Sequence, residues 1–261
     1  MKLGDVAGSI AQAMETDVRL LPLLPELLAD IWELGTSSED VIAALQSAGA
    51  ESGSTALDLG CGKGAVAVAL AERLGLGVEG VDAFAPFLES ARGLAKDRGV
   101  SSKCVFREGD IRQILARGME DEEFDVVLLL SVGPLSGDHR KTVGDLRRLV
   151  RKGGLIVIDD GFLAEGVTEL PHAEGYAGYD ETLRRLTAWG DELVHEIVAS
   201  AEETRAVNET NTELIRKRAL ELERKNPVLA PLIDEYVARQ EHETRVFGSD
   251  MVCATWVLRR A

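Results

Sequence analysis

Glycine recurs at every second position from Gly60 to Gly64, directly after a short apolar stretch that contains an aspartate, Asp58. A turn with so few side chains lets the backbone pass close to a ligand, and N–H groups at the start of the next helix can point at that ligand. The carboxylate of Asp58 would then lie beside the ligand rather than in the core. The stretch is therefore typical of a loop that binds a nucleotide or another anion.

Strand-sized apolar runs alternate with helix-length segments around and after this loop. We expect strands at residues 56–59, 78–81, 103–107, 125–130 and 155–158, and helices at 65–74, 86–98, 112–118 and 142–150. Nearly continuous apolar strands that are separated by helices indicate a parallel sheet covered on both faces. The fold class that we expect is therefore α/β and Rossmann-like, with helices on both faces of a mostly parallel sheet.

A polar side chain stands at the end of each of these five strands. The five residues are Asp58, Asp82, Asp110, Ser131 and Asp159. Ligands of parallel sheets bind beyond the carboxyl ends of the strands, so these side chains would gather at one edge. Acids at four of the five strand ends favour a nucleotide-like ligand.

The rest of the chain divides around this pattern. We expect an N-terminal helical cap at residues 1–50, a core at 51–199 with a sixth strand at 192–198, a charged helical insertion at 200–246, and the last strand within 247–261. The N-terminal helices would form a lid over a cleft or pack on the edge of the domain. The insertion would cap the acceptor pocket, form a dimer contact, or pack against the edge of the sheet.

Composition excludes several classes of partner. The 261 residues carry a formal net charge of −16, which repels nucleic acid and anionic membranes. The longest apolar runs are too short to cross a bilayer. The three cysteines lack the spacing of a zinc site, and no other metal site is readable, so we expect reduced thiols in a cytoplasmic protein without a bound metal.

The glycine stretch shares features with two other phosphate-binding loops. The P-loop pattern is absent, because Lys63 is followed by Gly64 rather than by Ser or Thr. The dinucleotide fingerprint of an NAD(P)-dependent oxidoreductase fits the glycine spacing, but Asp58 before the first glycine is unfavourable for a pyrophosphate. Asp110 after the third strand suits an adenine amino group instead. The oxidoreductase stays open as an alternative.

The sequence Leu-Asp-Leu-Gly-Cys-Gly-Lys-Gly at residues 57–64 resembles the first motif of class I S-adenosylmethionine-dependent methyltransferases. Residues 80–82 and 108–111 are similar to the second and third motifs, and 124–127 and 149–155 to the later ones. The resemblance covers about residues 54–160. It implies a seven-stranded sheet with an antiparallel last strand, S-adenosylmethionine as methyl donor, and S-adenosylhomocysteine as product.

The resemblance also implies roles for residues of the glycine loop and the second strand. The backbone around Gly60, Cys61 and Gly62 would approach the methionine and ribose parts of the cofactor. Asp58 would meet its amino group, directly or through water. Asp82, with Ala83 beside it in the cofactor site, would accept hydrogen bonds from both ribose hydroxyls.

Three further residues complete the cofactor site that the resemblance implies. Asp110 would bond the adenine amino group, Ile111 would lie beside the ring, and Ser131 would lie near the sulfonium. After Ser131 the chain continues Val-Gly-Pro, which is not the Asn/Asp-Pro-Pro-aromatic turn of enzymes that methylate exocyclic or amide nitrogens. We therefore expect a small-molecule acceptor.

A hydroxyl or amine acceptor needs a base, whereas alignment and exclusion of water suffice for an acceptor that is already nucleophilic. Candidate catalytic residues follow the fourth and fifth strands and are His139, Asp160, Glu165, His172, Tyr176 and Tyr179. Of these, His139, Tyr176 and Tyr179 are the residues that we favour. A non-catalytic S-adenosylmethionine-binding protein and a homodimer are further possibilities.

Overall fold

The computed structural model describes residues 3–117, 123–133, 135–168, 170, 174–247 and 249–261. Contacts within this part of the chain divide it into two compact units. We call Glu33–Ala199 with Asp250–Ala261 the sheet unit, and Met1–Trp32 with Ser200–Ser249 the helical unit. Each unit joins segments that are distant in the sequence, because the last strand returns to the sheet after the long helices.

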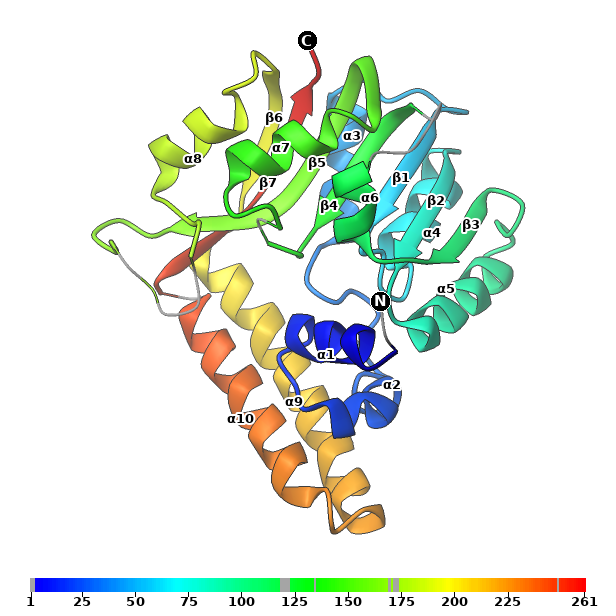
Figure 1. Ribbon diagram of the computed structural model, residues 1–261, viewed down its shortest axis with the longest axis vertical. Coiled ribbons are helices and arrows are strands. Elements are labelled where there is room, and N and C mark those ends of the chain that lie inside the picture. Colours follow the sequence, from blue (N-terminus) through cyan, green and yellow to red (C-terminus); the bar gives the residue numbers. More distant parts are fainter. Residues whose placement is uncertain (1–2, 118–122, 134, 169, 171–173, 248) are drawn as a thin grey trace. The chain divides into compact units, whose positions relative to one another are not determined.

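Within the described residues, the sheet unit contains a seven-stranded sheet in the order β3-β2-β1-β4-β5-β7-β6 (Figure 1). The strands are β1 (Thr55–Leu59), β2 (Gly77–Asp82), β3 (Cys104–Glu108), β4 (Phe124–Leu130), β5 (Val150–Leu163), β6 (Glu192–Val198) and β7 (Met251–Arg259). β1 pairs in parallel with β2 and β4, whereas β7 runs antiparallel to β5 and β6. The predicted Rossmann-like α/β fold with an antiparallel last strand is confirmed.

The direction of chain progress across the sheet reverses between β1 and β4. β1, β2 and β3 extend toward one edge, and β4 then pairs on the other side of β1. Ligands of parallel α/β sheets bind at such a reversal, beyond the carboxyl ends of the strands. The loops after β1 and β4 are therefore the expected walls of a site.

Helices cover both faces of the sheet. They are α3 (Ser38–Ser47), α4 (Ala65–Arg73), α5 (Ala85–Asp97), α6 (Ile111–Arg117), α7 (His139–Leu146) and α8 (Tyr179–Leu186). Because side chains alternate between the two faces of a strand, Ala56 packs into a buried cluster with α3, α4 and α5, whereas Leu57 packs with α7 and α8. The expected helix at 112–118 corresponds to α6, and residue 118 lies outside the described residues.

The segment between α7 and β5 differs from the expected helix at 142–150. α7 begins earlier because the side chain of Asp138 caps it and accepts a backbone N–H at 2.8 Å. Val150 already belongs to β5. Gly153 and Gly154, which follow the expected helix, lie at a shift in the pairing of β4 with β5, where a Cβ on Gly154 would lie 2.7 Å from the carbonyl oxygen of Asp125.

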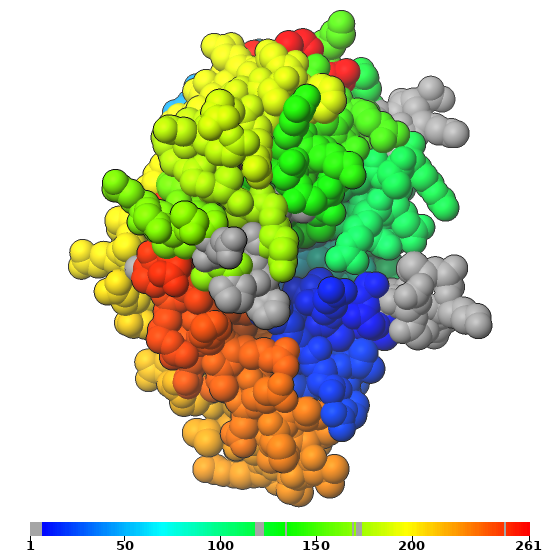
Figure 2. Space-filling model, turned by 60° about the vertical axis from the view of Figure 1, so that its left-hand side comes forward, coloured from blue at the N-terminus to red at the C-terminus, as the bar shows by residue number. Residues whose placement is uncertain are grey.

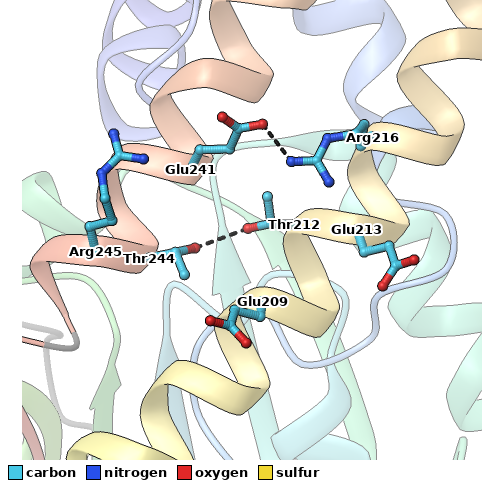
Figure 3. A pocket seen from close by; sticks show the side chains of 7 residues that line it. All are labelled: Glu209, Thr212, Glu213, Arg216, Glu241, Thr244 and Arg245. Carbon is cyan, nitrogen blue, oxygen red and sulfur yellow. Dashed lines mark hydrogen bonds and ion pairs between the residues drawn. The ribbon is translucent and has the colours of Figure 1, made fainter.

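Two long antiparallel helices, α9 (Ala201–Lys225) and α10 (Ala230–Val246), dominate the helical unit. The hydroxyl oxygens of Thr212 and Thr244 lie 3.0 Å apart, and Arg216 pairs with Glu241, both across the groove between the helices (Figure 3). None of the helices in the described residues combines the length and the apolar character that crossing a membrane requires.

The N-terminal part of the helical unit contains α1 (Leu3–Ala13), the 3-10 helix η1 (Val18–Leu23) and α2 (Leu24–Leu27). Pro22, which lacks a backbone N–H, lies inside the 3-10 helix. The N-terminal segment lies beside the long helices in Figures 1 and 2. Arg218 of α9 pairs with Asp30 at 2.6 Å, and Arg239 of α10 donates to the carbonyl oxygen of Glu15 at 2.7 Å.

Helix α3 belongs to the sheet unit. Its Val41 and Leu45 are completely buried in the same cluster as the side chains of α4. The boundary of the N-terminal segment therefore lies after Trp32, and residues 33–50 are part of the unit that holds the strand ends.

Candidate functional site

The glycine loop after β1 is fixed by backbone conformation and by bonds to β2. Gly60, Gly62 and Gly64 have φ values of +81°, +51° and +75°, a region that only glycine adopts without strain. The N–H groups of Gly60 and Cys61 both donate to the carbonyl oxygen of Val81, at 2.8 and 3.1 Å. The loop is therefore anchored to the neighbouring strand while its outer surface carries almost no side chains.

Asp82 joins the glycine loop to the loop after β2. Its carboxylate accepts the N–H of Gly62 at 2.9 Å and the N–H of Phe84 at 2.8 Å. Burial raises the pKa of Asp82, and backbone hydrogen bonds from Phe84, Gly62 and Ala83 partly offset that effect. The carboxylate is therefore held in one orientation by the backbone on both sides of it.

Asp58 is a buried acid beside Asp82, with an exposed fraction of only 2%. Burial, and then the charge of Asp82, raises the pKa of Asp58 to about 7. Among the residues that the structure describes, no hydrogen bond to the Asp58 carboxyl is found. A buried carboxylate without a donor is stabilised by a cation or an N–H group placed against it.

The Cys61 side chain packs beneath the loop. A Cβ on Gly80 of β2 would lie 2.8 Å from its sulfur. Burial raises the pKa of the Cys61 thiol, which keeps it protonated and unreactive. Cys61 therefore contributes its backbone rather than its thiol to the outer surface of the loop.

Asp110 and Ile111 begin helix α6, next to the glycine loop. The carboxylate of Asp110 caps the helix by accepting the backbone N–H of Arg112 at 2.9 Å, and it also accepts the side-chain Nε2–H of Gln113 at 3.3 Å. A Cβ on Gly60 would lie 3.8 Å from the Cδ1 atom of Ile111. The third motif, at residues 108–111, therefore lies next to the glycine loop of the first motif.

The loop after β4 also contacts the glycine loop. A Cβ on Gly60 would lie 2.9 Å from the Cγ2 atom of Val132, and a Cβ on Gly62 would lie 3.1 Å from Leu34. Sequence reasoning missed both apolar residues. Val132 directly follows Ser131 at the end of β4, and that position was a signal that could have identified it. Nothing in the sequence pointed to Leu34.

Ser131 has a φ of +53°, an unusual conformation for a residue other than glycine, and the half-buried acid Asp159 holds it there. Its hydroxyl donates to Asp159 at 2.9 Å and its N–H to the Asp159 carbonyl oxygen at 2.8 Å. Thr36 and Thr255 donate to the same carboxylate at 2.8 and 2.5 Å. Burial raises the pKa of Asp159, and the three hydroxyl groups partly offset that effect.

A second cluster lies where β5 passes the end of β4. The Nε2 atom of His139 lies 3.1 Å from Oδ2 of Asp160, and the Tyr176 hydroxyl donates to Oδ1 at 2.7 Å. His139 is completely buried, with its ring edge-on to those of Tyr176 and Trp256. A Cβ on Gly133 would lie 3.2 Å from the Tyr176 hydroxyl oxygen, so the cluster borders the loop after β4.

The remaining candidate residues lie apart from this cluster. Tyr179 is exposed, donates to Glu196 of β6 at 2.8 Å and packs on the ring of Phe162. Glu165 is exposed, and His172 lies outside the described residues. A catalytic role for Tyr179 stays a prediction. Among the described residues, no three or more His, Cys, Asp or Glu side chains gather in a way that could hold a metal ion.

Comparison with known proteins identifies the family. The family model described as "Methyltransferase domain" matches residues 50–222. The chain is 30% identical over 102 residues to norajmaline N-methyltransferase of Rauvolfia serpentina, covering 39% of this chain and 34% of that protein. It is 35% identical over 109 residues to ubiquinone biosynthesis O-methyltransferase of Pseudomonas paraeruginosa, covering 41% of this chain and 44% of that protein. The chain thus matches less than half the length of either relative.

Solved structures share the fold. An S-adenosylmethionine-dependent methyltransferase from Geobacter sulfurreducens, in complex with S-adenosyl-L-homocysteine, superimposes with a TM-score of 0.74 at 20% identity. The similarity covers 88% of this chain and 94% of that chain. The family match over more than half of the sequence agrees with this fold and with the order of motifs at the strand ends. The chain belongs to the methyltransferase-domain family.

Proposed function

We propose that this chain transfers a methyl group from S-adenosylmethionine to a small-molecule acceptor by direct displacement. The observation that carries the proposal is the pair of carboxylates at the glycine loop, of which Asp58 is buried and Asp82 is half-buried. Asp82 is held by backbone N–H groups, whereas Asp58 has no donor among the described residues. A ligand with an ammonium group and ribose hydroxyls matches this pair, because the ammonium needs a counter-ion and hydroxyls donate well to carboxylates.

The side chains around the loop fit the remaining parts of the cofactor. Asp58 would meet the amino group, and Asp82 would accept the ribose hydroxyls. Asp110 accepts the backbone N–H of Arg112 and the side-chain N–H of Gln113, but a carboxylate has about four acceptor positions, so it can also accept the adenine amino group. Ile111 offers an apolar surface for the ring at the same place.

When bound, S-adenosylmethionine supplies a methyl group attached to a positively charged sulfur. Leu34, Ile111 and Val132 place apolar side chains beside the glycine loop, where a bound cofactor would cover them and water would be excluded. Ser131, which Asp159 fixes, keeps the loop after β4 in one position. Alignment and exclusion of water are the main contributions that this displacement needs from a protein.

The acceptor that we propose is a small molecule that is methylated on nitrogen or oxygen. The two relatives described above are named as an N- and an O-methyltransferase, and the net charge of −16 disfavours a polyanionic acceptor. The homodimer, the cytoplasmic location and the lid or cap roles of residues 1–50 and 200–246 stay predictions.

Calorimetric titration with S-adenosylhomocysteine, NAD+ and NADP+ tests the proposal against the oxidoreductase alternative. We expect S-adenosylhomocysteine alone to bind, with one site per chain. Binding of a nicotinamide nucleotide in preference to S-adenosylhomocysteine would overturn the proposal. If the product binds but no amine, hydroxyl or thiol compound is methylated, the non-catalytic alternative is favoured instead.

A further inference from the structure

The cluster around Asp160 joins three elements of the sheet unit through one carboxylate. His139 comes from the first turn of α7, Asp160 from β5, and Tyr176 from the segment that pairs with the end of β5 before α8. Asp160 faces His139 at 3.1 Å with one oxygen and accepts the Tyr176 hydroxyl at 2.7 Å with the other. The N–H of Gly161 donates to that second oxygen at 2.9 Å. The carboxylate is therefore surrounded by donors.

His139 is oriented by the one nitrogen that has a partner. Its Nδ1 atom is buried and has no hydrogen-bond partner among the residues that the structure describes. An unpaired N–H at that position would cost more free energy than an unpaired lone pair. The hydrogen therefore lies on Nε2 and points at Asp160. Because the ring has no exposed surface, His139 cannot touch an acceptor and serves as a positioning residue for the carboxylate.

Tyr176 is the member of the cluster that can meet a ligand. It is half-buried, and its hydroxyl oxygen would lie 3.2 Å from a Cβ on Gly133, so a side chain at that position would crowd the hydroxyl. Gly133 directly follows Val132, the residue that packs against Gly60 of the cofactor loop. Burial and the neighbouring Asp160 raise the pKa of Tyr176, so its hydroxyl keeps its proton and donates it to Asp160. The lone pairs of the hydroxyl oxygen are then free to accept a hydrogen bond.

From this arrangement we infer that Tyr176 and Asp160 form a proton relay for the methyl acceptor, with His139 as the positioning residue. The inference rests on the proposed function and assigns the acceptor as a compound with an O–H or N–H proton to lose. As the bond from the acceptor atom to the methyl carbon forms, the bond from that carbon to sulfur breaks and its electron pair stays on sulfur. The acceptor proton passes to the Tyr176 oxygen, and the Tyr176 proton passes to Asp160, which becomes neutral.

The test compares Tyr176→Phe and Asp160→Asn with Tyr236→Phe, a matched loss of a phenol hydroxyl in the helical unit. Methyl transfer from radiolabelled S-adenosylmethionine is measured with para-substituted phenols of graded acidity, secondary amines and thiols. We expect kcat for phenols to fall by about 100-fold or more in Tyr176→Phe and Asp160→Asn, as for loss of a general base, while KM changes little. The loss should grow as the phenol becomes less acidic.

Two further readouts separate a relay from a structural role. S-adenosylhomocysteine affinity should be the same in all three variants and in the wild type, and His139→Gln, which keeps an N–H donor, should retain more activity than His139→Leu. Nitrogen-15 spectra of the labelled histidine rings should show the hydrogen of His139 on Nε2. This measurement needs no acceptor.

Three outcomes would overturn the relay. The first is a His139 ring that carries its hydrogen on Nδ1, and the second is a loss of kcat that is equal for all phenols. The third is a protein that binds S-adenosylhomocysteine but methylates only thiols, or no acceptor at all. In each case binding of S-adenosylhomocysteine still supports the proposed cofactor site. A wild-type protein that does not bind S-adenosylhomocysteine would instead contradict the proposed function itself.

Discussion

Gly62 donates its backbone N–H to the carboxylate of Asp82 at 2.9 Å, and this bond joins the loop after β1 to the end of β2. The second oxygen of Asp82 accepts the N–H of Phe84, so the carboxylate cannot rotate without losing a bond. The carboxylate is therefore oriented before any ligand arrives. Such pre-organisation reduces the entropy that binding has to overcome.

Replacement of Asp82 by asparagine should weaken binding of S-adenosylhomocysteine. Asparagine keeps the size of the side chain but removes the charge. Its NH2 group would also face one of the two backbone N–H groups, so a donor would meet a donor. Since a hydrogen bond to a charged group contributes about 1.5–3 kcal/mol, we expect calorimetry to show at least about a tenfold loss of affinity. Asp97→Asn, at the exposed end of α5, is the control and should bind as the wild type does. Equal affinity in both variants would contradict the role of Asp82.

Asp58 should make the ligand-free protein less stable as the pH rises. Its pKa is about 7 in the folded protein, against a reference value of 3.8. Between about pH 4 and pH 7 the folded protein keeps a proton that the unfolded chain has released, so the free energy of unfolding falls with pH, by at most about 1.4 kcal/mol per pH unit. Above about pH 7 the contribution of Asp58 is constant. Urea unfolding of Asp58→Asn should show a smaller decline over this window, and parallel curves for variant and wild type would contradict the assignment.

Protonation of Asp58 should also compete with the ligand. The ammonium group of S-adenosylhomocysteine requires the charged carboxylate, so affinity should fall by up to about tenfold per pH unit below pH 7 and level off above it. Calorimetry in buffers of different ionisation enthalpy should detect release of a proton at pH 6 but not at pH 8. Asp58→Asn should bind weakly and without this pH dependence. Proton uptake on binding at pH 6 would show that Asp58 does not face the ammonium.

Alanine at Gly60 should damage both the loop and the binding of S-adenosylhomocysteine. The φ of +81° costs a residue with a Cβ about 1–2 kcal/mol, and the added Cβ would lie 2.9 Å from Val132. We expect a lower melting temperature and a large loss of affinity. Gly93→Ala is the control, because a Cβ there meets nothing within 4 Å and alanine stabilises a helix by roughly 0.5–1 kcal/mol. A Gly60→Ala variant as stable as Gly93→Ala would mean that the loop is not constrained.

Valine at Thr36 should destabilise the sheet unit. The substitution keeps the shape but removes a hydroxyl that donates to the half-buried Asp159 at 2.8 Å and lies 2.7 Å from the Ser131 hydroxyl. Loss of a hydrogen bond to a buried carboxylate costs about 1–3 kcal/mol, which chemical denaturation can measure. Thr168→Val, at an exposed position, should change stability little. If both variants unfold at the same denaturant concentration, the Thr36 hydroxyl is not needed to hold Asp159.

Features that depend on local pattern were predictable from the sequence. The order of strands and helices follows from apolar periodicity, and the glycine loop follows from residue spacing. The structure accordingly places Asp58 and Asp82 at the same loop. The start of β5 was not predictable, because Val150 continues the apolar pattern of α7, and only its pairing with β4 shows that it belongs to the sheet.

Contacts between distant segments could not be predicted from one sequence. Thr36 reaches Asp159 across 123 positions of the chain, and nothing around Thr36 marks it as the partner of a strand end. His139 and Asp160 were each candidates for a base, but their contact depends on the position of α7 against β5. Tyr176 and Tyr179 are tyrosines only three positions apart, so the sequence does not distinguish them. In the fold, the Tyr179 hydroxyl donates to Glu196, whereas the Tyr176 hydroxyl donates to Asp160.

A crystal structure of the protein with S-adenosylhomocysteine is the most direct test of the proposed cofactor site. We predict the ribose hydroxyls within hydrogen-bond distance of the Asp82 carboxylate, the amino group beside Asp58, and the backbone of Gly60 against the ligand. A ligand bound elsewhere, without contact to Asp82 and Gly60, would contradict the account.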